Sequence, residues 1–205
     1  VMSKKPVIVF EGIEGSGKSF HINNVANYLK KKKIAFVKLR EPGGSQNSEK
    51  IRKLILDNKS NFNNNTDLLL YLASRSENIN LLNKFYKKKI ILIDRFVDST
   101  IAYQHYGMNV NLRFIKLINK FILNNFKVNF TFLNIVNKKN MLLRLKERKK
   151  LNRYDKFNQN FYSKVQKGYI KLAKKKSKNY MIINSNLTKK INQNLIIKKL
   201  ENLIK

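Results

Sequence analysis

The sequence contains no cysteine, which excludes disulfide bonds and thiolate metal sites. No apolar run approaches the ~20 residues that a transmembrane helix needs, so we expect no membrane span. The apolar run 7–10 is too short for a signal peptide, and we expect a cytoplasmic protein. The chain has 205 residues, 42% of them hydrophobic, which predicts one domain over residues 1–205 with a full core.

Acidic residues are scarce: 12 Asp and Glu stand against 44 Lys and Arg, and the formal net charge is +32. Such a charge would suit a protein that binds nucleic acid, with an affinity that falls steeply as salt is raised. However, 36 of the basic residues are lysine, and lysine, asparagine and isoleucine, which share A/T-rich codons, are abundant along the whole chain. We therefore favour compositional drift and expect no specific nucleic-acid partner; a nucleic-acid-binding protein is the alternative.

Glycine and proline are also rare, with 7 and 2 residues, and their positions are informative. Five of the seven glycines fall in two short segments, 12–17 and 43–44, and Pro42 adjoins the second. Where a composition disfavours a residue type, the copies that are present are more often physically required. Both segments are therefore candidates for a functional site.

Short apolar runs alternate with helical patterns, which predicts βαβ units and the parallel sheet of an α/β fold. Strands are predicted at 7–10, 35–39, 90–93, 130–135 and 180–183. Helices are predicted directly after Gly17 and at 67–82, because apolar residues recur there on one helical face. The polar segment 61–65 is expected to be a loop, and the charged stretch 147–155 a mobile segment.

One segment matches the phosphate-binding pattern G-x-x-x-x-G-K-[ST] in full: Gly12-Ile13-Glu14-Gly15-Ser16-Gly17-Lys18-Ser19. An apolar strand before it and an amphipathic helix after it are the context that this pattern needs. Glycines let the loop curl so that backbone N–H groups point at phosphate oxygens, and the helix N-terminus adds positive potential. Lys18 is expected to bridge the β- and γ-phosphates of ATP or GTP, and Ser19 to bind Mg²⁺. The pattern does not specify the phosphoryl acceptor.

Asp94 closes the predicted strand 90–93 and is followed by Arg95. A carboxylate at the C-terminal end of a neighbouring strand can hold Mg²⁺, usually through water. Ligands of open α/β sheets bind beyond the C-terminal ends of the strands, so both side chains are expected to face the site of Lys18. The alternative is that Asp94 is an ordinary polar residue at a strand end.

Further blocks follow in order: Arg40-Glu41-Pro42-Gly43-Gly44-Ser45, Glu49-Lys50-Ile51-Arg52, Tyr71-Leu72-Ala73-Ser74-Arg75 and Asp94-Arg95-Phe96-Val97-Asp98-Ser99-Thr100-Ile101-Ala102-Tyr103-Gln104. Their order and approximate spacing resemble bacterial thymidylate kinases over about residues 7–173. The resemblance implies a three-layer P-loop nucleoside-monophosphate kinase fold, with a five-stranded parallel sheet flanked by helices and a lid at approximately 144–156. It also implies a homodimer that transfers the γ-phosphoryl group of ATP to dTMP with Mg²⁺, giving dTDP and ADP for dTTP biosynthesis.

The resemblance implies that residues of the predicted helix 67–82 bind the base of dTMP. Tyr71 corresponds to an aromatic residue that stacks on thymine, and Arg75 to an arginine that hydrogen-bonds the base. At i and i+4 of a helix, the two side chains lie on the same side. Arg75 also continues an apolar stripe and therefore points inward, where its charge needs a partner. That partner is either the base edge or a carboxylate in a buried ion pair.

Other matches surround the same acceptor. Side chains implied near the base or sugar are Pro42, Thr100, Tyr103 and Gln104. Among these, Tyr103 corresponds to a residue that disfavours a 2′-hydroxyl group. Glu41, from the same block as Pro42, is assigned to the dTMP site without a specific role. Arg52 and Arg95 correspond to a pair that grips the acceptor phosphate, which suits planar guanidinium groups. Glu14 corresponds to an acid near the 3′-hydroxyl group and this phosphate.

The resemblance further implies a catalytic arginine in the lid, because the loop segment 14–16 carries none. Arg153 is the first candidate and Arg148 the second. Such an arginine neutralises charge on the transferred phosphoryl group and would act together with Lys18, Arg95 and Glu14. The chain departs from the family pattern at Phe20, Phe96 and Asn152. A kinase for another monophosphate, such as dUMP, dCMP or a guanylate, is the nearest alternative.

Overall fold

The computed structural model describes residues 5–148 and 151–205, and within them the chain forms a five-stranded parallel sheet of order β2-β3-β1-β4-β5. The strands are β1 (Val7–Glu11), β2 (Phe36–Arg40), β3 (Ile90–Asp94), β4 (Phe130–Ile135) and β5 (Tyr180–Asn184). The predicted α/β fold with five parallel strands is confirmed. Four strands extend one residue beyond the predicted end, because their last residues are polar and do not belong to the apolar run.

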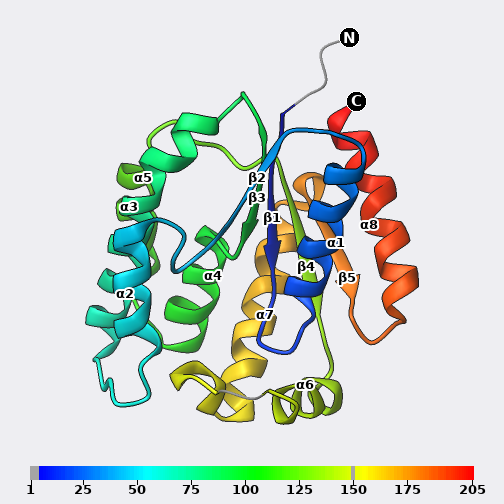
Figure 1. Ribbon diagram of the computed structural model, residues 1–205. Helices are drawn as coiled ribbons and strands as arrows, with labels where there is room; N and C mark the ends of the chain where they lie inside the picture. Colours follow the sequence, from blue (N-terminus) through cyan, green and yellow to red (C-terminus); the bar gives the residue numbers. More distant parts are fainter. Residues whose placement is uncertain (1–4, 149–150) are drawn as a thin grey trace.

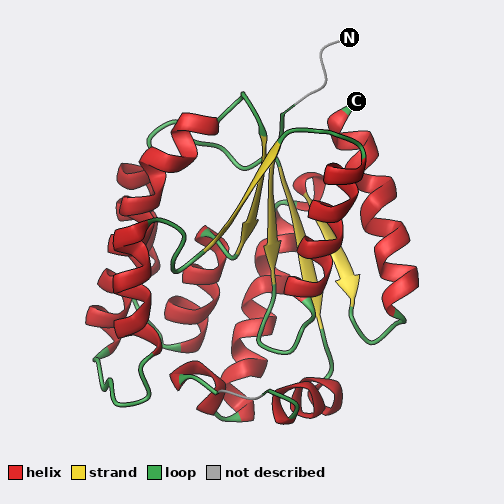
Figure 2. Cartoon of the chain, viewed as in Figure 1, coloured by secondary structure: helices red, strands yellow, loops and turns green. Residues whose placement is uncertain are grey.

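Helices cover both faces of the sheet (Figures 1 and 2). They are α1 (Lys18–Lys31), α2 (Gln46–Leu56), α3 (Asn64–Phe85), α4 (Val97–Thr100), α5 (Leu112–Leu123), α6 (Lys138–Lys146), α7 (Gln159–Lys175) and α8 (Lys189–Ile204). A π-helix, Ile101–Gly107, continues α4, and short 3₁₀ turns occupy Arg153–Lys156 and Ser177–Asn179. The three-layer arrangement implied by the resemblance is present.

The core forms because successive strand side chains point to opposite faces of the sheet. Ile8 and Phe10 of β1 pack with α1 and α8, while Val7 and Val9 pack on the other face with Leu82 of α3. Each fully buried side chain of this size stabilises the fold by about 1.5–3 kcal/mol relative to an exposed one. The packed sheet is therefore a rigid support for the loops that follow its strands.

All five strands end at the same edge, toward the bottom of Figure 1 and close to α6. Phe10 of β1 and Arg40 of β2 both pair in register with Asp94 of β3. The segments that follow these three strands are distant in sequence, yet the parallel register brings them together. This edge is where an open α/β sheet binds ligands.

Two predicted boundaries differ from the structure. Helix α3 begins inside the predicted loop 61–65, because the Asn63 side chain caps it by accepting from the backbone N–H of Thr66. The predicted lid 144–156 begins within α6, which ends at Lys146, and includes the turn Arg153–Lys156. Residues 149 and 150 of this lid lie outside the described residues.

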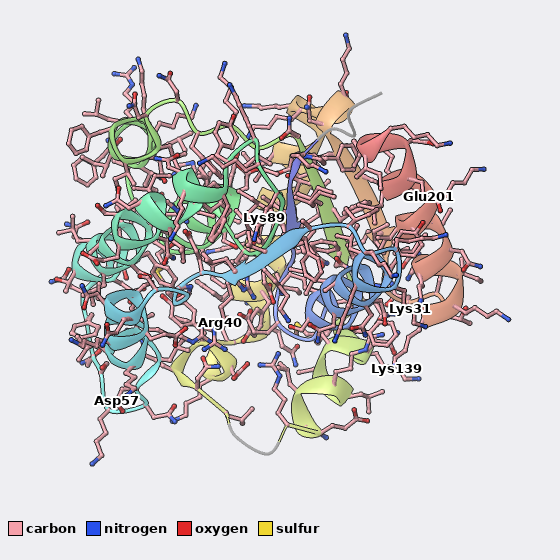
Figure 3. All side chains as sticks on the ribbon, turned by 45° about the horizontal axis from the view of Figure 1, so that its top comes forward. Lys31, Arg40, Asp57, Lys89, Lys139 and Glu201 are labelled. Atoms are coloured by element: carbon pink, nitrogen blue, oxygen red, sulfur yellow. The ribbon has the colours of Figure 1, made fainter. Side chains whose placement is uncertain are left out.

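Lysine side chains project from separate elements of the fold, such as Lys31 of α1 and Lys139 of α6 (Figure 3).

Within residues 5–148 and 151–205, every helix is too short or too polar to cross a membrane.

Candidate active site

A pocket opens at the C-terminal edge of the sheet. It is lined by every residue that the sequence assigned to the acceptor: Glu41, Pro42, Arg52, Tyr71, Arg75, Arg95, Thr100, Tyr103 and Gln104. Glu14, Lys18, Ser19 and Asp94 line it as well. Residues from four separate parts of the sequence therefore converge on one hollow beside the phosphate-binding loop.

The loop 12–19 has the backbone that its glycines permit. Gly12, Gly15 and Gly17 all have positive φ angles, of 142°, 68° and 84°. A Cβ atom at Gly12 would lie 2.3 Å from the carbonyl oxygen of Asn134, so this position has no room for a side chain. The loop is thus closed tightly against β4.

Lys18 is folded into this loop. Its side chain is buried, and Nζ donates to the carbonyl oxygen of Ile13 at 2.9 Å. Burial and the neighbouring Arg95 charge lower the pKa of Lys18 to about 8. The ammonium group is held in place for an anionic ligand, which would restore its proton affinity.

Two oxygen groups suitable for Mg²⁺ face each other at the loop. The Ser19 hydroxyl donates to the Asp94 carboxylate at 3.2 Å. The part of the chain that the structure describes contains no group of three or more His, Cys, Asp or Glu side chains that could hold a metal ion by themselves. A hydroxyl and one carboxylate fit Mg²⁺, which takes few protein oxygens and completes its shell with water and substrate phosphates.

Arg95, Glu14 and Tyr103 form a charged group in the pocket wall. Arg95 Nη2 lies 2.7 Å from Glu14 Oε1, and the Tyr103 hydroxyl donates to the other carboxylate oxygen of Glu14. Burial opposes ionisation of Glu14, but the charges of Arg95 and Lys18 outweigh it and lower the pKa of this carboxyl group. Glu14 is therefore an anion that orients both neighbours.

Arg75 is buried, with 1% of its surface exposed. Its guanidinium pairs with Glu41 at 2.7 Å and donates to Thr100 at 3.0 Å and to Asn119 at 2.6 Å. Of the two partners considered for this charge, the carboxylate in a buried ion pair is present. Arg75 also lines the pocket, so the same side chain faces the expected position of the base. Sequence reasoning missed Asn119, which lies on α5.

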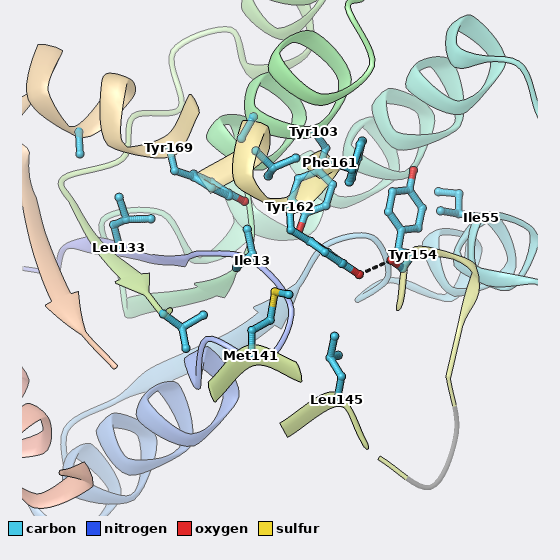
Figure 4. Close-up of a cluster of buried hydrophobic side chains, with 14 residues drawn as sticks. Ile13, Ile55, Tyr103, Leu133, Met141, Leu145, Tyr154, Phe161, Tyr162 and Tyr169 are labelled. Atoms are coloured by element: carbon cyan, nitrogen blue, oxygen red, sulfur yellow. Dashed lines mark hydrogen bonds between the residues drawn. The ribbon is translucent and has the colours of Figure 1, made fainter. Parts of the chain in front are cut away.

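Aromatic rings form another part of the wall. Tyr154, from the turn after α6, meets Tyr71 edge to face at 5.8 Å and Tyr103 at 5.9 Å between ring centroids. The Tyr162 hydroxyl donates to the Tyr154 carbonyl oxygen at 2.5 Å, as Figure 4 shows. Tyr154 lies within the predicted lid 144–156, but the sequence analysis assigned it no role in the site. Its place depends on the packing of α7 against the turn.

The two candidate lid arginines have different positions. Arg148 lines the pocket and pairs with Asp155. Arg153 pairs with Asp67 of α3 and donates to the carbonyl oxygen of Ile55 at 3.1 Å, and it is not among the residues that line the pocket. Arg153, the first candidate, therefore lies outside the lining of the pocket, and Arg148, the second, lies within it. No pattern in the sequence pointed to its partner, Asp67.

A second hollow of about 390 Å³ lies on the other side of the loop 12–19. Gly17, Phe20, His21 and Arg144 are among its lining residues. Arg144 donates to the carbonyl oxygens of Gly15 at 2.9 Å and Ser185 at 2.7 Å, which ties α6 to the loop. The two hollows thus flank the phosphate-binding loop, and each could take one nucleotide.

Comparisons with known proteins agree with this arrangement. A family model described as thymidylate kinase matches residues 10–196. Similar curated proteins include the thymidylate kinase of Thermosipho africanus, 40% identical over 178 residues, which are 86% of this chain and 88% of the relative. The thymidylate kinase of Kosmotoga olearia is 32% identical over 192 residues, 92% of each chain. A crystal structure of thymidylate kinase from Ehrlichia chaffeensis matches with a TM-score of 0.77 and 28% identity, covering 95% of this chain and 98% of that one.

Proposed function

This chain belongs to the thymidylate kinase family and is a dTMP kinase, and we propose that it binds dTMP in the pocket at the C-terminal edge of the sheet. One observation carries the proposal: all nine residues assigned to the acceptor line this pocket, next to the phosphate-binding loop. In this proposal thymine lies near Tyr71 and Thr100, and the acceptor phosphate lies near Arg52 and Arg95.

The donor ATP would occupy the other side of the loop. Its phosphates would lie in the curl of residues 12–19, with Lys18 at the β- and γ-phosphates and the adenine in the hollow beside Phe20 and Arg144. Ser19 and Asp94 would hold Mg²⁺, which when bound neutralises charge on the phosphates.

Catalysis by these residues is positioning and charge neutralisation. A phosphate oxygen of dTMP attacks the γ-phosphorus of ATP, the bond to the bridging oxygen breaks, and ADP leaves. The attacking oxygen is already anionic, so no side chain needs to remove a proton from it. Arg52 and Arg95 would orient this oxygen, while Glu14 would hold Arg95 and Tyr103 in place.

We assign the lid arginine that reaches the transferred phosphoryl group to Arg148. Its side chain lines the pocket, whereas Arg153 is engaged by Asp67 and Ile55. This assignment replaces the order of candidates drawn from the sequence. Arg153 is instead proposed to hold the lid segment against α3.

A homodimer is also part of the proposal. Helix α5 exposes three large apolar side chains at i, i+3 and i+7, with Phe114 42%, Leu117 63% and Phe121 83% exposed. Such a continuous apolar stripe is costly in water and typical of a contact surface. We propose that a second copy of the chain covers this stripe, because a two-fold axis brings the same stripe of two copies together.

We also propose a cytoplasmic location, which cell fractionation tests.

The acceptor assignment is tested by ADP release from ATP and Mg²⁺ with dTMP, dUMP, dCMP, dAMP, dGMP, UMP and GMP. We expect strong preference for dTMP, with dUMP a poor second. The variant Tyr71→Ala is expected to raise KM for dTMP while KM for ATP stays constant. An equal rise in the KM values for dTMP and ATP would contradict the proposed placement of thymine.

A further inference from the structure

Glu11 is a buried acid that the mechanism above does not use. It is the last residue of β1, directly before the phosphate-binding loop, and it has no exposed surface. A buried carboxylate is costly unless several donors satisfy it. Each oxygen of Glu11 has such donors, and all of them come from two elements next to Arg95.

The first oxygen, Oε1, caps a helix. It accepts the backbone N–H of Phe96 at 2.9 Å and of Ser99 at 3.2 Å, at the start of α4. Phe96, at the N-cap position of α4, has no side-chain acceptor for these donors. Glu11 therefore supplies the cap from a neighbouring strand.

This cap stabilises an unusual backbone at Arg95. Arg95 has a φ angle of +66°, in the left-handed region that residues other than glycine rarely adopt. A conformation of this kind persists only when its surroundings fix it. Glu11 fixes the residue that follows Arg95 and so determines where the arginine side chain leaves the backbone.

The second oxygen, Oε2, acts on the guanidinium of Arg95 through two hydroxyl groups. It accepts from Ser99 Oγ at 2.6 Å and from the Tyr169 hydroxyl at 3.0 Å, and these two hydroxyl oxygens are 2.6 Å apart. Arg95 Nη1 contacts the same hydroxyl oxygens, at 3.5 Å for Ser99 and 3.3 Å for Tyr169. The three oxygens form a triangle directly behind the guanidinium.

The direction of these hydrogen bonds matters. Burial raises the pKa of Glu11, and the Ser99 hydrogen bond, the charge of Arg95 and the Phe96 N–H oppose that rise. Both Glu11 oxygens accept hydrogen bonds, and as a carboxylate Glu11 only accepts, so the protons of both hydroxyl groups are used inside the triangle. Each hydroxyl oxygen then keeps a lone pair for the N–H groups of Arg95. An amide nitrogen in place of Oε2 would donate to the hydroxyl groups instead. Only one hydroxyl proton could then be used between Ser99 and Tyr169, so the other would turn outward and oppose Arg95.

We propose that Glu11 is a positioning residue that fixes Arg95 for the acceptor phosphate, by capping α4 and by orienting the hydroxyl groups of Ser99 and Tyr169. Arg95 is thereby held from two sides, by this triangle at Nη1 and by Glu14 at Nη2. The inference rests on the proposed role of Arg95 at that phosphate.

The test compares Glu11→Gln, Tyr169→Phe and Arg95→Ala by calorimetric titration with dTMP, thymidine and ATP, after circular dichroism has verified folding. Glu11→Gln is expected to weaken dTMP binding about tenfold, because it reverses hydrogen bonds to a charged group. Binding of thymidine, which lacks the phosphate, and of ATP is expected to stay within about twofold. Tyr169→Phe, which leaves the cap intact, is expected to weaken dTMP binding by a smaller factor and carries the test if Glu11→Gln fails to fold.

A double-variant cycle separates positioning from a general structural role. In the Arg95→Ala background, Glu11→Gln and Tyr169→Phe are expected to cause no further loss of dTMP affinity. Full additivity, or an equal loss for thymidine and dTMP, overturns the inference. If Arg95→Ala weakens dTMP binding and the other two variants do not, the inference fails while the role of Arg95 stands. If Arg95→Ala leaves dTMP binding unchanged, the proposed role of Arg95 fails first.

Discussion

Arg75 and Glu41 form an ion pair at 2.7 Å in which both side chains are almost completely buried. The pair joins α3 to the segment after β2, so it links the helix of Tyr71 to the wall at Pro42. Burial raises the pKa of Glu41, and the charge of Arg75 opposes that rise. Removal of either partner would leave the other charge unpaired in a site with almost no solvent exposure.

Arg75→Ala is therefore expected to lower the free energy of unfolding by about 3–5 kcal/mol, the usual cost of breaking a buried pair. It should also weaken dTMP binding much more than ATP binding. Urea denaturation and calorimetric titration measure the two effects. The double variant Arg75→Met with Glu41→Leu is the control, and it should be more stable than Arg75→Ala because no charge is left unpaired. An Arg75→Ala protein as stable as wild type would contradict the energetic role of the pair.

The two lid arginines are expected to differ in kinetics. Arg148→Ala should lower kcat by about 10³-fold with little change in either KM, because an arginine at the transferred phosphoryl group acts in the transition state. Arg153→Ala, the matched control, should lower kcat less than about tenfold, since its side chain bonds Asp67 instead. Single-turnover measurements compare the variants. The opposite order would return the catalytic role to Arg153.

ATP use is expected to depend on pH through Lys18, whose pKa is lowered to about 8 by burial and by Arg95. The charged form binds phosphate, and it is lost as the pH rises through this value. The ratio kcat/KM for ATP, which reports the free enzyme, should therefore fall above about pH 8. The fall in kcat should come at higher pH, because bound phosphates raise the pKa of Lys18. A kcat/KM profile that is flat up to pH 10 would contradict this account.

Helix α5 is expected to hold the dimer together. Phe121→Glu places a charge at the most exposed residue of the apolar stripe and should convert the dimer to monomers in analytical ultracentrifugation. Lys116→Glu, at an exposed position of the same helix outside the apolar stripe, adds the same side chain and should leave the dimer intact. If both variants stay dimeric, the contact surface lies elsewhere.

The sequence predicted the strands because their runs are short, mostly apolar and bounded by polar residues. It missed the last residues Glu11 and Asp94 as strand members for the same reason: they are polar. These are also residues to which we assign proposed roles, since parallel strands end at the ligand edge of the sheet. The pattern that locates the core therefore stops one residue before the site begins.

The sequence could not supply long-range partners. Asn119 accepts a hydrogen bond from Arg75, which is 44 positions away in the sequence. Asp67 accepts one from Arg153, which is 86 positions away. In a chain with so many basic residues, local charge does not reveal which arginine faces the pocket. Only the packing of α3 against the lid segment separates Arg148 from Arg153.

Helix α3 carries both the anchor of the lid and part of the acceptor pocket. Asp67, in its first turn, accepts from Tyr154 and Arg153, and Tyr71 and Arg75 follow one and two turns later. Because a helix moves as a unit, the two substrates are expected to be thermodynamically linked. A dTMP molecule that fixes α3 reduces the cost of docking the lid, and ATP under the lid then raises the affinity for dTMP by the same factor. This coupling needs no separate regulatory site, because the affinity of the enzyme for dTMP would rise with the concentration of ATP.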